Sequence, residues 1–453
     1  MENQSIDFIP SVEESHPKCL HGPTLLFERF TVEGKRTGRK FFACSSCRDR
    51  NDCPFFQWAD EQITYHVQQK KKKHAENSKN LNFSSKTIHK QLKRLLSLPC
   101  HIRRFCKTCF LLVLPEDFGE HKDHEILEGL SDNILKQPSY LLPSLSKNKK
   151  EAQYFFDEKT VAFVVSTVKS LGFTRILSIG TPRIHEYIKM NKTIDLQSLL
   201  LDIDKRYVQF YKSREFCHYN MFNHFFFDGE TAEETYKKFL LKDDGNSLLV
   251  MLDPPFGGLV DVISHTLKKI SNTWRNGKYD TSEELPIFWF FPYFNEARIQ
   301  QCLPSLKMLD YKVNYDNHRL FNGSIKGRKQ GSPVRIFTNI KPEKIKLPEE
   351  DGYRFCPLCK KYVAPENEHC NVCNTCPSKD GRPYKHCSDC NRCVKNSRQH
   401  CVTCGQCMLP NHECGVVSRA GRCHICGAVG HKRRECPNKD NHSAPRKKKR
   451  RLC

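Results

Sequence analysis

The chain has 453 residues, of which 38% are hydrophobic and 11% aromatic, so it can form a sizeable core and two to four folded units. It has no run of about 18 apolar residues and no apolar segment near the N-terminus, so we expect neither a membrane span nor a secretory signal. The net charge of +23 favours a polyanionic partner, most simply nucleic acid, over a basic surface that only meets solvent. Most of the 25 cysteines crowd into residues 356–436, and such thiols in a reducing compartment are expected to bind zinc.

Residues 1–16 are expected to be disordered, and residues 17–66 to form a small zinc module. The spacing of cysteine, histidine and glycine there, with the aromatic run at 55–58, resembles a GRF-type zinc finger. The resemblance implies four zinc ligands: Cys19, His21, Cys44 and Cys53. Cys47 is not one of them. Such fingers bind single-stranded nucleic acid, and Phe55, Phe56 and Trp58 either stack on bases or fill the core, with at least one in the core.

Residues 67–99 are predicted to be a basic linker, which includes Lys70–Lys73, followed by a helix at about 87–98. A second zinc finger is predicted at 100–130, where two cysteines and two histidines supply a tetrahedral ligand set: Cys106, Cys109, His121 and His124. Its two histidines are closer in sequence than usual. We therefore interpret it as a structural brace and not as a reader of a nucleic-acid groove.

Between residues 150 and 342 cysteine becomes rare, and apolar runs alternate with amphipathic stretches. Strands are predicted at 175–180, 198–202, 248–252, 286–291 and 334–338, and helices at 162–171 and 183–190. This alternation predicts an α/β domain with a mostly parallel sheet covered on both faces. Ligands of such sheets bind beyond the carboxyl ends of the strands.

Gly180 follows the first of these strands, and Asp202 ends the second, 22 residues later. A plain strand-to-helix turn would also explain Gly180. An acid at the end of the second strand, however, accepts hydrogen bonds from a ribose in Rossmann-like cofactor sites. The phosphate-binding GxGxxG pattern is missing, so a cofactor without a pyrophosphate, S-adenosylmethionine, fits better than NAD.

The strand at 248–252 ends in Asp-Pro-Pro-Phe-Gly-Gly (residues 253–258), which could be a simple strand-ending turn. The functional alternative is a site for an adenine amine. Asp253 and the carbonyl of Pro254 can accept hydrogen bonds from N6, and Phe256 can stack on the base. Pro254 and Pro255 fix φ, and the glycines leave room for the substrate. The base would have to be flipped out of its stack.

The segment 353–416 contains a repeat of His-Cys-x2-Cys-x2-Cys with sixteen ligands, enough for four zinc sites. We predict interleaved sets, listed in chain order: Cys356, Cys359, His369 and Cys376; Cys370, Cys373, His386 and Cys393; Cys387, Cys390, His400 and Cys407; Cys401, Cys404, His412 and Cys414. The repeat resembles the zinc-bound cysteine-rich domain of DHHC palmitoyltransferases. The diagnostic acid–His–His–Cys reads Arg-Gln-His-Cys at 398–401, so we expect a structural or RNA-facing rod and no acyl transfer.

The spacing at 421–438 is that of a CCHC zinc knuckle, a module that binds single-stranded nucleic acid. Its ligands are Cys423, Cys426, His431 and Cys436. With the modules above, this gives about seven Zn²⁺ sites. The basic tail at 439–453 is interpreted as a nuclear or nucleolar address, an RNA contact or a solubilising end, in that order.

The order of modules resembles the zinc-knuckle-containing rRNA N6-adenosine methyltransferases over nearly the whole chain. The resemblance implies a Rossmann-like class I methyltransferase domain with a mostly parallel seven-stranded sheet, flanked by small zinc modules. It implies S-adenosylmethionine-dependent methylation of one adenosine in structured large-subunit (28S) ribosomal RNA, supporting translation, without a membrane partner and in the nucleus, nucleolus and cytoplasm. The implied catalytic residues are Asp253, Pro254, Pro255 and Phe256. The implied cofactor-binding residues are Gln153, Tyr154, Phe155, Phe156, Arg183, Asp202, Asn220, Met221 and Asp253.

Two alternatives stay open on the sequence alone. The Asp-Pro-Pro-Phe tetrapeptide also occurs in DNA adenine methyltransferases, so deoxyribose substrates have to be compared with ribose substrates. A non-catalytic, zinc-dependent RNA-binding protein could keep an inactive methyltransferase fold. The presence of Asp202, Asp253 and Phe256 argues against this second alternative.

Overall fold

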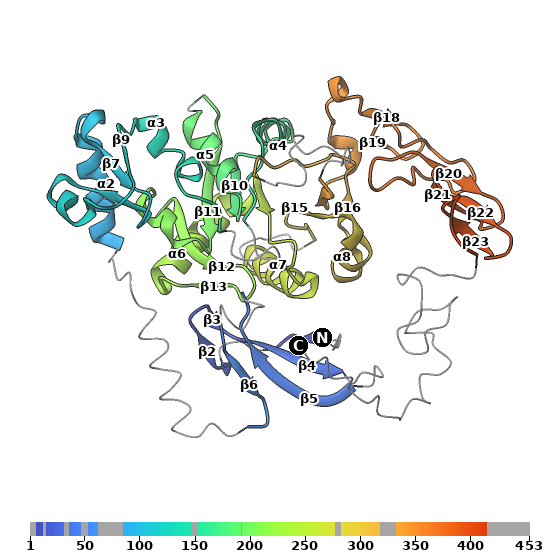
Figure 1. Cartoon of the computed structure of the whole chain (residues 1–453), viewed down its shortest axis with the longest axis horizontal. Coiled ribbons are helices and arrows are strands. Elements are labelled where there is room, and N and C mark those ends of the chain that lie inside the picture. The colour runs from blue at the N-terminus through green and yellow to red at the C-terminus, as the bar shows by residue number, and fades with distance from the viewer. Residues whose placement is uncertain are drawn as a thin grey trace, which may run out of the picture.

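The computed structural model describes residues 6–11, 15–30, 36–46, 53–61, 85–145, 153–191, 193–276, 282–317 and 332–414. A large α/β domain lies at the centre, with a small β module against one side, a second finger at one end of the sheet and an elongated hairpin rod at the other (Figure 1). Cys47, Lys70–Lys73, the zinc knuckle and the basic tail lie outside the described residues. Within the described ranges, we find no helix with the length and apolar character needed to cross a membrane.

The central domain is built on an eight-stranded sheet. Its strands are β10 (Arg175–Ile179), β11 (Gln197–Asp202), β12 (Phe216–Asn220), β13 (Phe225–Phe226), β14 (Leu248–Leu252), β15 (Ile287–Pro292), β16 (Lys307–Met308) and β17 (Val334–Thr338). Their order is β13-β12-β11-β10-β14-β15-β17-β16. The five strands from β12 to β15 in this order are parallel, and β13, β17 and β16 pair antiparallel with their neighbours. The mostly parallel α/β sheet is therefore confirmed, but the prediction of seven strands is wrong: the chain turns back after β12, and β13 adds a short edge strand.

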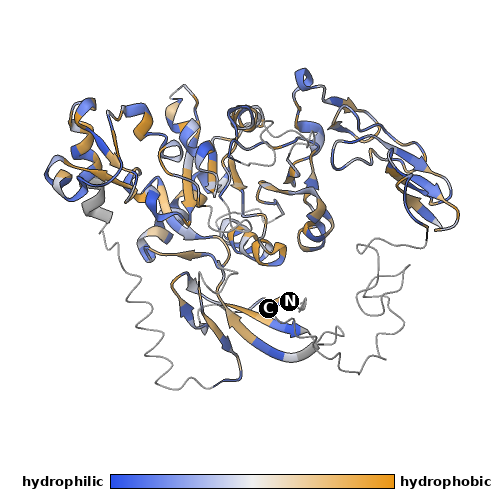
Figure 2. Ribbon diagram, in the orientation of Figure 1, coloured by the Kyte–Doolittle hydropathy of each residue, from blue (hydrophilic) through white to orange (hydrophobic). Residues whose placement is uncertain are grey.

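Helices cover both faces of this sheet, as a parallel sheet requires. On one face α4 (Glu158–Ser170) and α5 (Pro182–Met190) pack against residues such as Ile176 and Met251. On the other face α6 (Glu230–Leu241), α7 (Val260–Arg275) and α8 (Glu296–Cys302) pack against residues such as Leu177 and Val250. Successive residues of one strand thus pack against helices on opposite faces of the sheet. Figure 2 shows the hydrophobic residues concentrated in the central strands and on the inner sides of the helices.

The N-terminal module holds two antiparallel sheets. The larger one has the order β1-β4-β5-β6, with β1 (Ile6–Ile9), β4 (Leu25–Phe30), β5 (Arg36–Ala43) and β6 (Phe56–Trp58), and the smaller one pairs β2 (Lys18–Cys19) with β3 (Gly22–Pro23). The expectation that residues 1–16 are disordered is wrong for β1. Phe8 packs against Phe27 and against His265 of α7, with ring centroids 6.2 and 5.5 Å apart, so burial of this aromatic ring stabilises the strand.

The second finger joins helix α2 (Ser85–Ser97) to a three-stranded sheet of β7 (Arg104–Cys106), β8 (Leu111–Val113) and β9 (Ile126–Glu128), followed by the short helix α3 (Asp132–Leu135). Its Phe105 lies in one apolar cluster with Tyr207 and Phe216 of the central domain. The side chain of Gln209 accepts from the main chain of Leu112 at 2.8 Å and donates to the carbonyl of Phe110 at 2.8 Å. These contacts support the interpretation of this finger as a brace.

The rod consists of three two-stranded hairpins: β18 (Arg354–Cys356) with β19 (Lys361–Val363), β20 (Tyr384–Cys387) with β21 (Arg392–Lys395), and β22 (Gln399–Cys401) with β23 (Gln406–Met408). It extends away from the β16 end of the sheet (Figure 1). Its base is anchored by the buried Asp310, which accepts from the side chain of Asn367 at 2.6 Å and from the main chain of Ala364 at 3.1 Å. A buried carboxylate that receives two such bonds fixes where the rod leaves the central domain.

Candidate active site and metal centres

Three of the residues predicted from the sequence lie side by side at the carboxyl edge of the sheet. The register pairs Ile179 of β10 with Leu201 of β11 and with Leu252 of β14. The next residues along are Gly180, Asp202 and Asp253. The main chain of Gly180 donates to the carbonyl of Leu201 at 2.9 Å, and that of Asp253 to the carbonyl of Ile179 at 3.1 Å. The structure therefore brings together the ribose-type acid, the glycine turn and the Asp-Pro-Pro-Phe loop where parallel sheets bind ligands.

Gly180 is required by this arrangement for two reasons. Its φ angle is +65°, a region in which side chains are strained. A Cβ atom at this position would lie 3.1 Å from the carbonyl oxygen of Asp253 and 3.1 Å from Cε of Met221. Glycine therefore lets β10 lie close to the Asp253 main chain and to Met221, another predicted cofactor residue.

Asp202 is a buried acid, and among the described residues no salt bridge to it is found. Its Oδ1 accepts from the main chain of Asp204 at 2.9 Å, whereas Arg206 pairs with Asp204, with Nη2 and Oδ2 2.7 Å apart. Burial, reinforced by the negative charge of Asp204, raises the pKa of Asp202 to about 7. A buried carboxyl group of this kind is stabilised by hydrogen bonds from hydroxyl groups, and a ribose has two hydroxyl groups that can donate.

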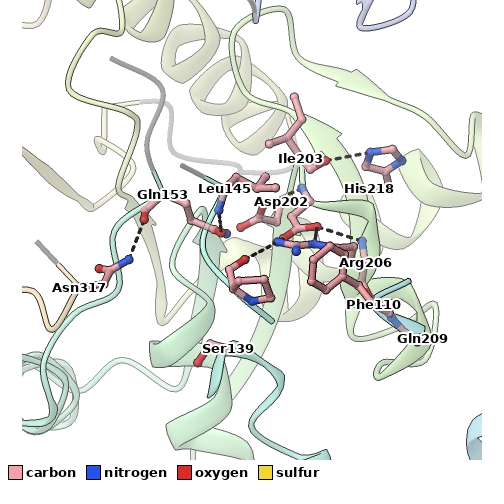
Figure 3. A network of polar contacts seen from close by, with 12 residues as sticks. Phe110, Ser139, Leu145, Gln153, Asp202, Ile203, Arg206, Gln209, His218 and Asn317 are labelled. Carbon is pink, nitrogen blue, oxygen red and sulfur yellow. Dashed lines mark hydrogen bonds and ion pairs between the residues drawn. The ribbon is translucent and has the colours of Figure 1, made fainter. Parts of the chain in front are cut away.

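Ile203 is a residue of the site that the sequence reasoning missed. It follows Asp202 directly, and 36% of it is exposed although its neighbours are buried. His218 of β12 lies beside it, with Nε2 3.1 Å from the Ile203 carbonyl, so this histidine nitrogen donates (Figure 3). An apolar side chain next to Asp202 is a suitable surface for the flat base of a nucleoside. The sequence signal that could have identified Ile203 is its position directly after Asp202.

Asp253 has one hydroxyl partner, Tyr315, which the sequence reasoning also missed. The Tyr315 hydroxyl donates to Oδ1 of Asp253 at 3.0 Å. Burial raises the pKa of Asp253 well above its usual value, and the bond from Tyr315 opposes that rise. Tyr315 thus shifts the group toward the carboxylate, the form that accepts hydrogen bonds through both oxygens.

Aromatic rings surround this carboxyl group. The ring of Phe256 stacks on Tyr154, with centroids 5.1 Å apart and planes 25° from parallel, and Tyr315 meets Phe256 edge-on at 5.9 Å. A planar base that stacks on the side of Phe256 covered by Tyr154 would have to displace that ring. Phe256 follows Asp253 by three residues, so these rings surround the loop that also carries the carboxyl group.

The predicted segment 153–156 is held in place by the residues that follow Tyr315. The side chain of Asn317 donates to the carbonyl of Gln153 and accepts from the main chain of Phe155, both at 2.9 Å. Arg183 donates to the carbonyl of Phe156 at 2.8 Å and pairs with Asp316. The side chain of Phe156 is buried against Phe290, with centroids 4.7 Å apart. Arg183 and Phe156 therefore shape the backbone of this segment, and Tyr154 lines the site itself.

Asn220 is placed differently from what its predicted role suggests. Its side-chain amide donates to the carbonyl of His21 and to the hydroxyl of Ser45 in the N-terminal module, both at 2.8 Å. The Asn220 side chain thus belongs to the interface with the N-terminal module.

The predicted zinc ligands of the described modules come together in the predicted sets. In five four-residue groups, all ligand atoms lie within 4.8 Å of one another: Cys19, His21, Cys44 and Cys53; Cys106, Cys109, His121 and His124; Cys356, Cys359, His369 and Cys376; Cys370, Cys373, His386 and Cys393; Cys387, Cys390, His400 and Cys407. In the third group, Sγ of Cys359 lies 3.3 Å from Nδ1 of His369 and 3.7 Å from Sγ of Cys376. Such separations suit ligands about 2.0–2.3 Å from one tetrahedral ion.

The last predicted set of the rod is also assembled. Sγ of Cys401 lies 3.5 Å from Sγ of Cys414, and Nε2 of His412 lies 3.4 Å from Sγ of Cys404 and 3.5 Å from Sγ of Cys414. Thiolate and imidazole donors at tetrahedral spacing are the usual donor set of structural zinc. The donor groups therefore fit Zn²⁺ in all six described ligand sets. The knuckle ligands Cys423, Cys426, His431 and Cys436 lie outside the described residues.

Comparison with known proteins agrees with the α/β domain and with the N-terminal zinc finger. A family described as "Probable N6-adenine methyltransferase" matches residues 147–339, and one described as "GRF zinc finger" matches residues 17–62. The chain is 48% identical over 445 residues to the rRNA N(6)-adenosine-methyltransferase ZCCHC4 of Homo sapiens, covering 96% of this chain and 86% of that protein. It is 47% identical over 435 residues to the protein of the same name from Xenopus tropicalis, covering 94% and 88%. This identity extends over the zinc modules as well as the α/β domain, and the chain belongs to the family of the rRNA N(6)-adenosine-methyltransferase ZCCHC4.

Proposed function

We propose that this protein transfers a methyl group from S-adenosylmethionine to N6 of an adenosine in large-subunit (28S) ribosomal RNA. The observation that carries the proposal is the alignment of Gly180, Asp202 and Asp253 along one sheet edge, with Tyr315 and Phe256 around the last carboxyl group. The printed names of the relatives support ribosomal RNA as the substrate. The strand order, with β17 antiparallel beside β15, supports a Rossmann-like class I methyltransferase domain to which β13 is an addition.

The residues of the site have different roles in binding the cofactor and the adenine. Asp202 accepts from the ribose of the cofactor, Gly180 and Met221 lie close together at the same sheet edge, and Tyr154 lines the neighbouring part of the site at Phe256. The bound cofactor supplies an electrophilic methyl group. Asp253 and the Pro254 carbonyl accept from the two N6 hydrogens of the adenine and thereby orient the nitrogen lone pair. The rate gain comes mainly from this orientation and from fixed dipoles, so Asp253 does not have to act as a strong base.

The adenosine has to be flipped out of its stack to reach this edge, which is least costly in a loop or a single strand of structured RNA. The zinc modules, about seven sites in all, support the proposal because small zinc folds present basic and aromatic side chains to nucleic acid. We include in the proposal residence in the nucleus, nucleolus and cytoplasm, where ribosomal RNA is made and used. Imaging of a tagged full chain tests this last point.

Matched oligonucleotides separate RNA methylation from DNA methylation. Two single strands of one sequence, one with ribose and one with deoxyribose throughout, are incubated with the protein and methyl-labelled cofactor. We expect faster transfer to the ribose strand by at least tenfold in kcat/KM. Equal or faster transfer to the deoxyribose strand would make the protein a DNA adenine methyltransferase.

Cofactor affinity should depend on pH through Asp202. Because the pKa of Asp202 is raised to about 7, part of this group is protonated at neutral pH and one oxygen cannot accept from a hydroxyl. We therefore expect affinity to strengthen as pH rises from 6 to 8 and to level off above the pKa. Calorimetric titration with S-adenosylhomocysteine at several pH values measures this. Asp202→Asn should bind more weakly at every pH and lose the dependence, and an unchanged slope in this variant would assign the titration to another group.

Tyr315→Phe should move the acid limb of the kcat–pH profile to higher pH. The lost hydrogen bond favoured the carboxylate of Asp253, so its loss raises the pKa of Asp253 further. A hydrogen bond to a charged group contributes about 1.5–3 kcal/mol, which corresponds to a shift of roughly one to two pH units. Tyr353→Phe is the matched control, because that hydroxyl accepts from the main chain of Lys312 at 3.0 Å, away from Asp253. Identical kcat–pH profiles for the two variants would show that Tyr315 does not influence the titration of Asp253.

A further inference from the structure

The N-terminal finger is bonded directly to the strand that leads into the cofactor region. The side-chain amide of Asn223 donates to the carbonyls of His21 at 3.0 Å and Pro23 at 2.7 Å. That of Asn220 donates to the same His21 carbonyl and to the hydroxyl of Ser45, both at 2.8 Å. Asn220 is 0% exposed and Asn223 3% exposed, so these four bonds are formed away from water. Buried amide donors of this kind fix relative position because leaving them unpaired is costly.

The close approach of the two parts depends on a glycine. Gly22 lies between His21 and Pro23 with a φ angle of +91°. A Cβ atom there would lie 2.5 Å from Cδ1 of Phe225 and 3.1 Å from Nδ2 of Asn223. The finger loop can therefore reach the β12–β13 hairpin only without a side chain at position 22. Apolar contacts extend the interface, since Phe222 and Val262 of the central domain pack in the finger's own cluster around Phe27.

The residue that follows this strand lies at the proposed methyl-transfer site. Met221 follows Asn220, and its Cε is 3.1 Å from where a Cβ of Gly180 would lie, as is the carbonyl oxygen of Asp253. On the finger side, Nδ1 of His21 lies 3.4 Å from Sγ of Cys44, within the predicted zinc set, and Ser45 is the next residue. A continuous series of contacts thus runs from the zinc ligands through Asn220 to Met221 and the edge of β10.

We propose that the GRF-type finger is a positioning element of the methyl-donor site, and that this role is separate from any contact it makes with RNA. With zinc bound, His21 and Ser45 are fixed, they hold the amides of Asn220 and Asn223, and Met221 stays against Gly180. This inference rests on the proposed function, because it takes the methyl donor to lie beside Met221. The coupling is reciprocal: a finger that strengthens cofactor binding is itself held more firmly when the cofactor is bound.

The first test is calorimetry on the full chain with S-adenosylhomocysteine, the demethylated product of the cofactor. Asn223→Ala removes two hydrogen bonds and should weaken binding about tenfold. The KM for S-adenosylmethionine should rise in the same variant, while kcat at saturating cofactor stays near that of the wild type. Lys40→Ala, an exposed basic residue on β5 of the same finger, is the control: it should lower RNA affinity only. Zinc content and circular dichroism check that each variant is folded.

The second test follows zinc itself and does not depend on turnover. Transfer of zinc to a chromogenic chelator is measured with and without saturating S-adenosylhomocysteine. In the wild type, the ligand should slow the release of one zinc equivalent, and in Asn223→Ala and Gly22→Ala this protection should disappear. Equal affinity and equal zinc release in wild type and Asn223→Ala would overturn the inference and leave the finger as an RNA module. A wild type that does not bind S-adenosylhomocysteine at all would instead overturn the proposed function.

Discussion

A hundred- to thousand-fold loss of methyl transfer is the expected result of Asp253→Asn, on the order found when one preorganised polar group is removed from an active site. The amide keeps the shape of the carboxyl group but replaces one acceptor with a donor that opposes the N6 hydrogens. The neighbouring Tyr315 hydroxyl also loses its charged partner. The measurement is the single-turnover rate with methyl-labelled cofactor and RNA, which separates the transfer step from product release.

Asp261→Asn is the matched control for this experiment. Asp261 lies in the first turn of α7, eight residues after Asp253, and pairs with Arg298 on the surface. Its loss should change the rate less than about threefold, because exposed ion pairs contribute about 0–1 kcal/mol. Wild-type rates in Asp253→Asn would contradict the assignment of the Asp-Pro-Pro-Phe loop. Absence of transfer by the wild-type protein itself would favour the alternative in which the fold is inactive and the protein only binds RNA.

Removal of zinc should unfold the rod and the fingers while the central sheet survives. The buried apolar cluster at the base of the rod consists of Cys356, Val363 and Cys376, two of which are ligands, so zinc replaces a hydrophobic core there. Structural zinc contributes about 10–16 kcal/mol in isolated finger peptides. After chelation, hydrogen exchange should become fast in β18–β23 and stay slow in β10, β14 and β15. RNA affinity should fall at the same time.

Single substitutions separate the zinc sites from general effects of thiol loss. Cys390→Ser removes one ligand of the third rod site and should release one zinc equivalent. Cys100→Ser is the control, because Cys100 is exposed and belongs to none of the predicted ligand sets. Full RNA binding by the zinc-free protein would contradict the prediction that the zinc modules bind RNA.

The parallel strands were predictable because strands buried on both faces are continuous apolar runs. The predicted strands at 175–180, 198–202 and 248–252 match β10, β11 and β14 within one residue. Strand β12 was not predicted, because it carries His218 and Asn220. Those polar side chains are explained by their partners: Asn220 bonds to the N-terminal finger and His218 to the carbonyl of Ile203, while Phe216 of the same strand packs with the second finger. Helices α6 and α7 were also missed, since their apolar residues are interrupted by charged ones on the exposed face.

The same distinction applies to the site. Gly180, Asp202 and Asp253 were predictable because each directly follows or ends an apolar run. Tyr315, Asn317 and Asn223 act through partners that lie far away in the sequence, and no local pattern marks them. The ligand sets of the rod were predictable because a tetrahedral site leaves few pairings of regularly spaced cysteines and histidines.

Identification of the methylated nucleoside tests the central claim most directly. Purified ribosomal RNA is incubated with the full chain and methyl-labelled S-adenosylmethionine and digested to nucleosides, which are separated by liquid chromatography and identified by mass spectrometry. The account predicts that the label appears as N6-methyladenosine, and that Asp253→Asn reduces it at least a hundredfold. Label in another nucleoside, or equal N6-methyladenosine from wild type and Asp253→Asn, would contradict it.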